Sequence, residues 1–163
     1  MSRFRRGFSW LGQNITAAGL GAFLAAAGCV LLWISGGSGW YPVKAMRCDL
    51  PPLAALFTAD LLVSGFLGAS AALCAVLGRE RGAACGAFGG TAAAWLFGLG
   101  WYAVFFCTRM TLFGAFLLAA SLLAIGSSAV VLIRMRAPAP SWIFLLPAAL
   151  GDLWFLVLTC SAL

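Results

Sequence analysis

The sequence predicts an all-α membrane protein in which a single domain folds as a bundle of five transmembrane helices. Hydrophobic residues make up 64% of its 163 residues, charged residues make up only 9%, and the mean hydropathy is +1.06. A soluble domain needs roughly 25% charged residues to cover its surface. Lipid solvates apolar side chains directly, so the composition favours a membrane protein over a soluble protein with an unusually apolar core.

Five apolar blocks are each long enough to cross a hydrocarbon layer of about 30 Å, at about 1.5 Å per residue in a helix. These blocks must be helical, because lipid offers backbone polar groups no outside partner. Clusters of glycine, arginine and proline separate them. The predicted spans are residues 13–35, 53–78, 82–106, 110–133 and 142–163.

The basic residues between the blocks predict the orientation, because cytoplasmic loops carry an excess of Lys and Arg. With the N-terminus in the cytoplasm, only Lys44, Arg47 and Arg109 lie outside. The apolar stretch after residues 1–12 is too long for a signal peptide, so we expect an uncleaved first span. We expect a bacterial cell membrane, with the C-terminus outside. The inside residues are then Arg3, Arg5, Arg6, Arg79, Arg81, Arg134 and Arg136.

Several function classes are excluded or disfavoured by composition. The chain has no His, which excludes His-ligated zinc or haem, a His general base and a Ser-His-Asp triad. Its six Cys form no CxxC pair, so we expect no metal site. The net charge of +6 sits between apolar blocks and indicates topology rather than nucleic-acid binding. Cys48 and Cys107 both fall on the outer side, where two free thiols are favoured over a disulfide.

Two acids inside apolar blocks are the strongest indication of a functional site. Asp60 lies in the second predicted span and Asp152 lies in the fifth. An ionisable group at that depth costs about 2.5–3.5 kcal/mol and normally faces a cavity or a partner. The predicted spans contain no Lys or Arg to pair with either acid, so both acids are candidates to line a cavity. Alternatively, each hydrogen-bonds a nearby hydroxyl and is merely tolerated; Thr58, Ser64 and Thr159 are available.

Aromatic residues in the third and fifth spans form a second candidate feature. Flat aromatic walls suit a planar apolar ligand, with stacking that contributes about 0.5–1.5 kcal/mol per pair. The alternative is ordinary helix packing and interfacial anchoring. The residues are Trp95, Trp101, Tyr102, Phe105, Phe106 and Trp154.

Gly82, Gly86 and Gly90 form a stripe with four-residue spacing at the start of the third span. Such a stripe lets a second helix approach closely, so we predict a homodimer interface there. The alternative is close packing within one chain.

The outer loop, residues 36–52, contains aromatic and proline residues. Trp40, Tyr41, Pro51 and Pro52 make it suitable as a cap over a cavity. An interfacial aromatic belt with turn prolines is the alternative explanation.

At this loop the sequence resembles the TspO/MBR family of tryptophan-rich sensory and translocator proteins. Trp40-Tyr41 precedes Pro51-Pro52 at the family's spacing, and the family's Trp-x-x-x-Phe-Phe motif reads Trp101 to Phe106 here. Pro147 matches a proline near the start of the family's fifth helix. The resemblance covers residues 13–163.

The sequence also departs from the family's pattern. Asp60 and Gly151 stand where the family usually has tryptophans, and Gly98 replaces an asparagine. Nothing basic follows Thr159, so the cholesterol-recognition pattern of animal members is absent. Light-dependent porphyrin breakdown, reported for some members, relies on pocket tryptophans. We therefore expect a binding protein rather than an enzyme.

The resemblance implies a cavity, next to the second and fifth helices, that binds a porphyrin or another tetrapyrrole without needing a cofactor. It also implies dimerisation through the third helix and a sensing, regulatory or transfer role. The alternatives are a small proton- or cation-coupled transporter, or an accessory membrane subunit that binds no ligand. The expected ligand-binding residues are Trp40, Asp60, Ser64, Trp101, Phe105, Phe106, Asp152 and Trp154, with Tyr41, Pro51 and Pro52 in the lid.

Overall fold

The computed structural model describes residues 3–35 and 51–162, in which five long helices run alternately up and down. The described residues contain no strand, and the predicted all-α five-helix fold is confirmed. The elements are α1 (Arg3–Ser35), α3 (Leu53–Glu80), α4 (Ala84–Tyr102), the π-helix η1 (Ala103–Thr108), α5 (Thr111–Arg134), α6 (Ala139–Ile143) and α7 (Leu145–Ser161).

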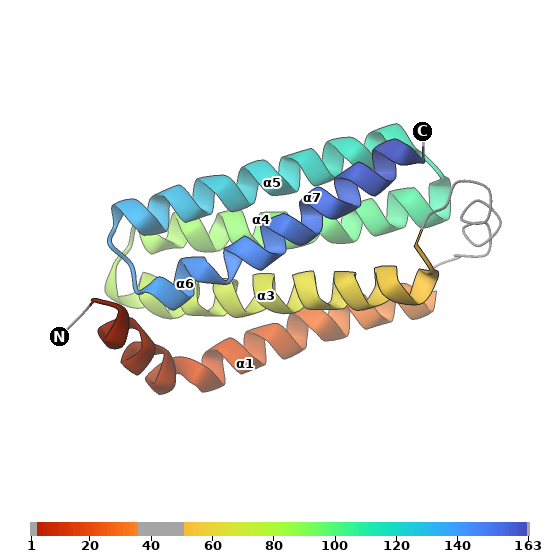
Figure 1. The fold of residues 1–163 in the computed structure, drawn as a ribbon. Coiled ribbons are helices and arrows are strands. Elements are labelled where there is room, and N and C mark those ends of the chain that lie inside the picture. The colour runs from red at the N-terminus through yellow and green to blue at the C-terminus, as the bar shows by residue number, and fades with distance from the viewer. Residues whose placement is uncertain (1–2, 36–50, 163) are drawn as a thin grey trace.

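Helix α3 lies at the centre of the arrangement, because it packs against α1, α4 and α7. Helix α5 packs against α4 and α7 on the other side of the bundle. Figure 1 shows α7 crossing the bundle diagonally, with the N-terminus at one end and the C-terminus at the other. We call the end with the C-terminus the C-terminal end. Here α1 finishes, α3 begins and η1 leads into α5.

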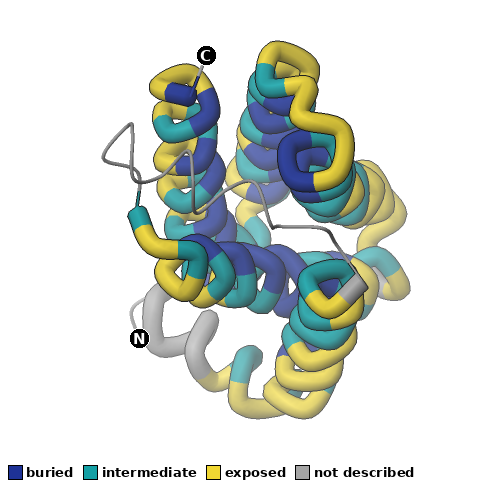
Figure 2. The backbone as a smooth tube through the Cα atoms, turned by 90° about the vertical axis from the view of Figure 1, so that its right-hand side faces the viewer, coloured by how far each residue is buried: buried dark blue, intermediate teal, exposed yellow. Residues whose placement is uncertain are grey.

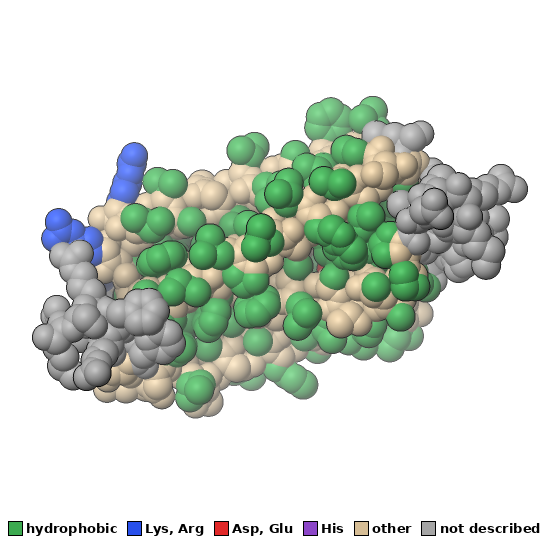
Figure 3. Space-filling view, viewed as in Figure 1, with side chains coloured by type: hydrophobic (Ala, Val, Ile, Leu, Met, Phe, Trp, Pro, Cys, Tyr) green, Lys and Arg blue, Asp and Glu red, His purple; other side chains and the backbone are tan. Residues whose placement is uncertain are grey.

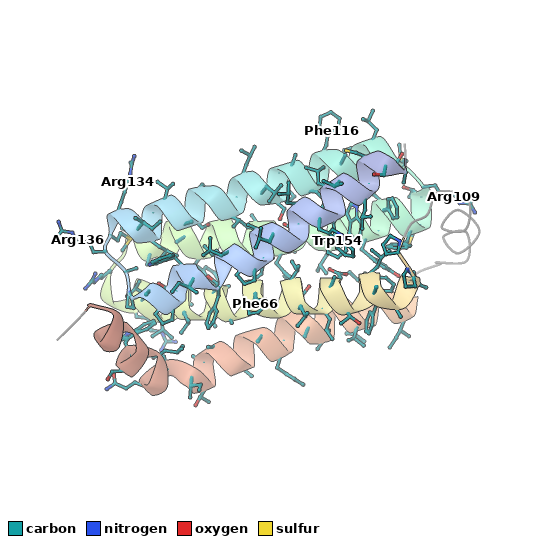
Figure 4. The ribbon with its side chains drawn as sticks, viewed as in Figure 1. Phe66, Arg109, Phe116, Arg134, Arg136 and Trp154 are labelled. Carbon is teal, nitrogen blue, oxygen red and sulfur yellow. The ribbon has the colours of Figure 1, made fainter. Side chains whose placement is uncertain are left out.

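The surface of this bundle is suited to lipid. Buried residues face the interior, and the outward faces of the helices are exposed (Figure 2). Hydrophobic side chains cover the length of the face in Figure 3, whereas the arginines visible there gather at one end. Figure 4 places Arg134 and Arg136 at that end and Arg109 at the C-terminal end. Five apolar helices with such a surface support an integral, multi-pass membrane protein.

A kink in α1 marks the start of the first span. Asn14 has non-helical backbone angles (φ −115°, ψ 15°), and its side-chain amide donates to the Trp10 carbonyl at 3.0 Å. This local hydrogen bond competes with the helical ladder and bends the helix. The predicted span begins at Gln13, beside the kink, although the helix itself starts at Arg3.

Proline residues and residues with a left-handed backbone conformation separate the other helices. Pro52 precedes α3 in an extended conformation, and its carbonyl accepts the Ala55 amide at 2.9 Å. Arg109 and Arg136 have positive φ angles of 59° and 54° where η1 and α5 give way to the next connection. The Ser70 hydroxyl donates to the Ser141 carbonyl at 2.7 Å and ties α6 to α3.

Helices α1 and α3 approach each other closely at two glycines. A Cβ atom added to Gly21 would contact the Gly68 carbonyl oxygen, and one added to Gly68 would contact the Gly21 oxygen. The same added atom on Gly21 would lie 2.6 Å from the Ala72 Cβ. Small residues let membrane helices pack this closely, so this pair fixes how α1 sits on α3. Neither glycine belongs to the stripe predicted from the sequence.

The predicted glycine stripe is divided between two environments. An added Cβ at Gly90 would contact the Ser128 hydroxyl and lie 3.2 Å from the Ala124 carbonyl of α5. Gly82 and Gly86 are exposed, with nothing within 4 Å of an added Cβ. Gly90 therefore serves packing within the chain, whereas a dimer interface at Gly82 and Gly86 stays a prediction.

Candidate functional site

Six aromatic side chains gather at the C-terminal end of the bundle, from α1, α4, η1 and α7. Ring centroids lie 4.8 Å apart for Trp33 and Tyr102, and 4.8 Å apart for Tyr102 and Phe106. Trp101 stacks on Phe105 at 5.4 Å, and these distances fall in the favourable range for aromatic pairs. We call this set the aromatic cluster: Trp33, Trp101, Tyr102, Phe105, Phe106 and Phe155.

The π-helix η1 explains how adjacent phenylalanines both face inward. Its turns are wider than those of an α-helix, and the Arg109 amide donates to the Val104 carbonyl five residues earlier. Phe105 and Phe106 are 3% and 1% exposed as a result. Both were predicted as site residues from the Trp101 motif. Single π-turns occur frequently at functional sites.

Asp60 is buried beside this cluster and accepts hydrogen bonds from α1. The Trp33 indole N–H donates to its Oδ2 atom at 2.8 Å, and the Cys29 thiol donates to the same atom at 3.3 Å. Ser64, another predicted site residue, is also buried and lies beside the Cys29 thiol. Thr58 is exposed and donates to a backbone carbonyl on its own helix, so the partners of Asp60 come from α1.

Asp152 on α7 makes a short hydrogen bond with the Ser121 hydroxyl of α5. The Ser121 oxygen also lies 3.1 Å from the Ala94 carbonyl of α4. Thr159 is engaged elsewhere, since it accepts from Trp101 at 2.9 Å.

The structure brings the two acids into one interior. Gly151, next to Asp152, packs directly on Val63 of α3, near Asp60. Asp60 is 6% exposed and Asp152 is 2% exposed, so neither faces lipid.

Trp154 lies outside this interior, although we predicted it as a wall residue. It is 37% exposed, and its ring lies 5.2 Å from Phe155. Two residues along a helix correspond to a rotation of about 200°, so an inward Asp152 turns Trp154 away. Phe155 takes the inward position and was missed because nothing in its local pattern distinguishes it.

Two buried polar atoms have no hydrogen-bond partner in the described structure. They are the Tyr102 hydroxyl and the Trp95 indole nitrogen, both on α4. Buried polar groups in proteins are almost always paired, so such atoms need an explanation.

Some predicted residues fall outside the described ranges. Trp40, Tyr41 and Cys48 belong to this group. Of the predicted lid residues, the structure therefore describes only Pro51 and Pro52. Cys107 is a free, exposed thiol. Within residues 3–35 and 51–162, no three His, Cys, Asp or Glu side chains gather into a metal-binding group.

The fold and site define a class: a five-helix membrane protein with an aromatic, acid-containing interior at one end. The chain matches no protein-family model, no curated protein and no solved structure. The TspO/MBR resemblance therefore rests on the short motifs quoted above.

Proposed function

We propose that the protein binds a hydrophobic planar ligand, such as a porphyrin, at the aromatic cluster. Its role is sensing, regulation or transfer, as the TspO/MBR resemblance implies. The observation that carries this proposal is the convergence of aromatic rings from four elements beside the buried carboxyl of Asp60. Ligand sites are mostly apolar, with a few placed polar groups, and this interior has that composition.

The position of the cluster supports the lid function proposed for the first outer loop. Ser35 ends α1 and Pro51 precedes α3 at the C-terminal end, next to the aromatic cluster. The loop between them therefore begins and ends beside the proposed site. A ligand held there would contact Trp33, whose partly exposed ring lies 5.2 Å from Phe106.

Quenching of tryptophan fluorescence by protoporphyrin IX, titrated into detergent-purified protein, tests the proposal. Phe106→Ala removes a ring from the centre of the cluster, and we expect affinity to fall about tenfold or more. Phe66→Ala is the control, because Phe66 pairs with Phe144 at 6.2 Å, away from the cluster. Equal losses in both variants, or no quenching of the native protein, would contradict the proposal.

The acids provide a second test of the same site. We expect Asp60→Asn and Asp152→Asn to change porphyrin affinity while expression is retained, because amides preserve size and hydrogen bonding. Equal loss of folding in both variants would instead favour a purely structural role for the acids.

Proton-coupled transport is the second candidate function, and the two acids buried in the bundle favour it. A proteoliposome flux assay with a pH gradient distinguishes it from binding alone. Transport requires flux that Asp60→Asn and Asp152→Asn abolish. An accessory subunit would show neither porphyrin binding nor flux.

A further inference from the structure

The Tyr102 hydroxyl is buried without a partner in the middle of the aromatic cluster. The residue is 1% exposed, and its oxygen has no hydrogen-bond partner in the described structure. Leaving a buried hydroxyl unpaired is destabilising, so a chain that keeps a Tyr where a Phe would fill the same space needs a reason. From the sequence, Tyr102 was predicted only as part of an aromatic wall.

The surroundings of Tyr102 are mostly aromatic, and its hydroxyl has no hydrogen-bond partner in the described structure. Its ring lies 4.8 Å from Trp33 on one side and 4.8 Å from Phe106 on another. The Trp33 indole N–H donates to Asp60 at 2.8 Å, so the Asp60 carboxyl group borders the same cluster. The Oδ2 atom of Asp60 already accepts from Trp33 and Cys29, which hold it toward α1.

We propose that the Tyr102 hydroxyl donates a hydrogen bond to an uncharged carbonyl oxygen on the bound ligand; this inference rests on the ligand-binding function proposed above. The hydroxyl has an unused hydrogen, so its natural partner is an acceptor. An anionic acceptor is disfavoured beside the carboxyl group of Asp60 and in an apolar interior. The site therefore selects planar ligands that carry an ester, ketone or amide carbonyl at their edge.

Two porphyrin probes separate this hydrogen bond from stacking. Protoporphyrin IX dimethyl ester carries carbonyl oxygens, whereas etioporphyrin carries only alkyl groups around the same macrocycle. We expect Tyr102→Phe to lower affinity for the ester about fivefold to tenfold, the effect of one hydrogen bond. Affinity for etioporphyrin should stay within about twofold, because the aromatic ring is retained.

Thermal unfolding of the unliganded protein provides an independent readout. Tyr102→Phe should unfold at the same temperature as the native protein or higher, because it removes an unpaired polar group. Ser70→Ala is the matched control, since the Ser70 hydroxyl is buried and donates to Ser141. That variant should lose stability without changing the affinity for either probe.

Each outcome bears on the inference. Selective loss of ester affinity with unchanged or raised stability supports it. Equal loss for both probes, or no change for either, overturns the Tyr102 assignment and leaves the binding function standing. Lower stability of Tyr102→Phe also overturns it, because the hydroxyl would then be paired in the unliganded protein, for instance to a water. Failure of the native protein to bind either probe overturns the proposed function and this inference together.

Discussion

Asp60 of α3 holds α1 in place through side-chain hydrogen bonds. The sequence of either helix alone does not predict these bonds. Its Oδ2 atom accepts from two donors on α1, Trp33 and Cys29. A polar contact between membrane helices stabilises their association and fixes their relative rotation. The same contact orients the Trp33 ring toward Tyr102 and Phe106, so a structural bond also shapes the proposed site.

Replacing Asp60 with Leu should destabilise the protein by about 1–3 kcal/mol, because the indole and thiol donors would remain buried without an acceptor. Asp60→Asn keeps a carbonyl oxygen for Trp33 and should cost less. Thermal unfolding in detergent, followed by tryptophan emission, measures both. Equal stability of the Leu variant and the native protein would show that the hydrogen bond from Trp33 contributes nothing.

The depth of the acids was predictable from the sequence, but their partners were not. Asp60 and Asp152 interrupt apolar blocks, so their burial in the bundle follows from the cost of placing them in lipid. Trp33, Cys29 and Ser121 were not predicted as partners. These spans are apolar on all sides and carry no amphipathic stripe to show which face turns inward. For the same reason the outward position of Trp154 could not be foreseen.

At the scale of helices, small residues determine the packing when they face each other across two helices. Regular spacing of small residues along one helix is not sufficient. Gly21 and Gly68 each stand apart from any long glycine series, yet they form a close contact between α1 and α3. Gly82, Gly86 and Gly90 form the more regular series in the sequence, although only Gly90 among them packs against α5. A local pattern cannot identify a contact that depends on two distant segments.

Gly68→Val should destabilise the fold by about 1–3 kcal/mol or more, because its side chain would collide with the backbone of α1. Gly65→Val on the same helix is the control, since nothing lies within 4 Å of a Cβ added there. Unfolding midpoints in detergent compare the two variants. Similar midpoints would contradict the close contact between Gly21 and Gly68.

Gly86→Leu should dissociate the predicted homodimer while each subunit remains folded, because Gly86 is exposed and a Cβ added there has nothing within 4 Å. Gly90→Leu is unsuitable for this test, since it would disturb α5. Sedimentation or light scattering of the detergent-solubilised protein reports the change in mass. A dimer that survives Gly86→Leu would reject this interface.

At the scale of the whole molecule, the composition and the five apolar blocks were sufficient to predict the fold class, because lipid permits few alternatives to a helical bundle. Local detail was less predictable. The π-turn of η1 and the separation of α6 from α7 depend on packing within the bundle, which block lengths do not reveal.

The orientation predicted from the basic residues can be tested with native cysteines at the two ends of the third span. Cys85 and Cys107 are both exposed, one at the start of α4 and the other in η1. A membrane-impermeant maleimide applied to intact cells should label a variant that retains only Cys107, and not one that retains only Cys85. Lysis should make both reactive. The reverse pattern would place the N-terminus outside.

The central claim is that the aromatic cluster beside Asp60 forms a ligand site in the interior of the bundle. An experimental structure of the detergent-solubilised protein with bound protoporphyrin IX dimethyl ester tests this most directly. We expect the macrocycle to lie against Trp33 and Phe106, with a carbonyl oxygen within hydrogen-bonding distance of the Tyr102 hydroxyl. A macrocycle bound only on the outer, lipid-facing surface near Trp154 would contradict the account.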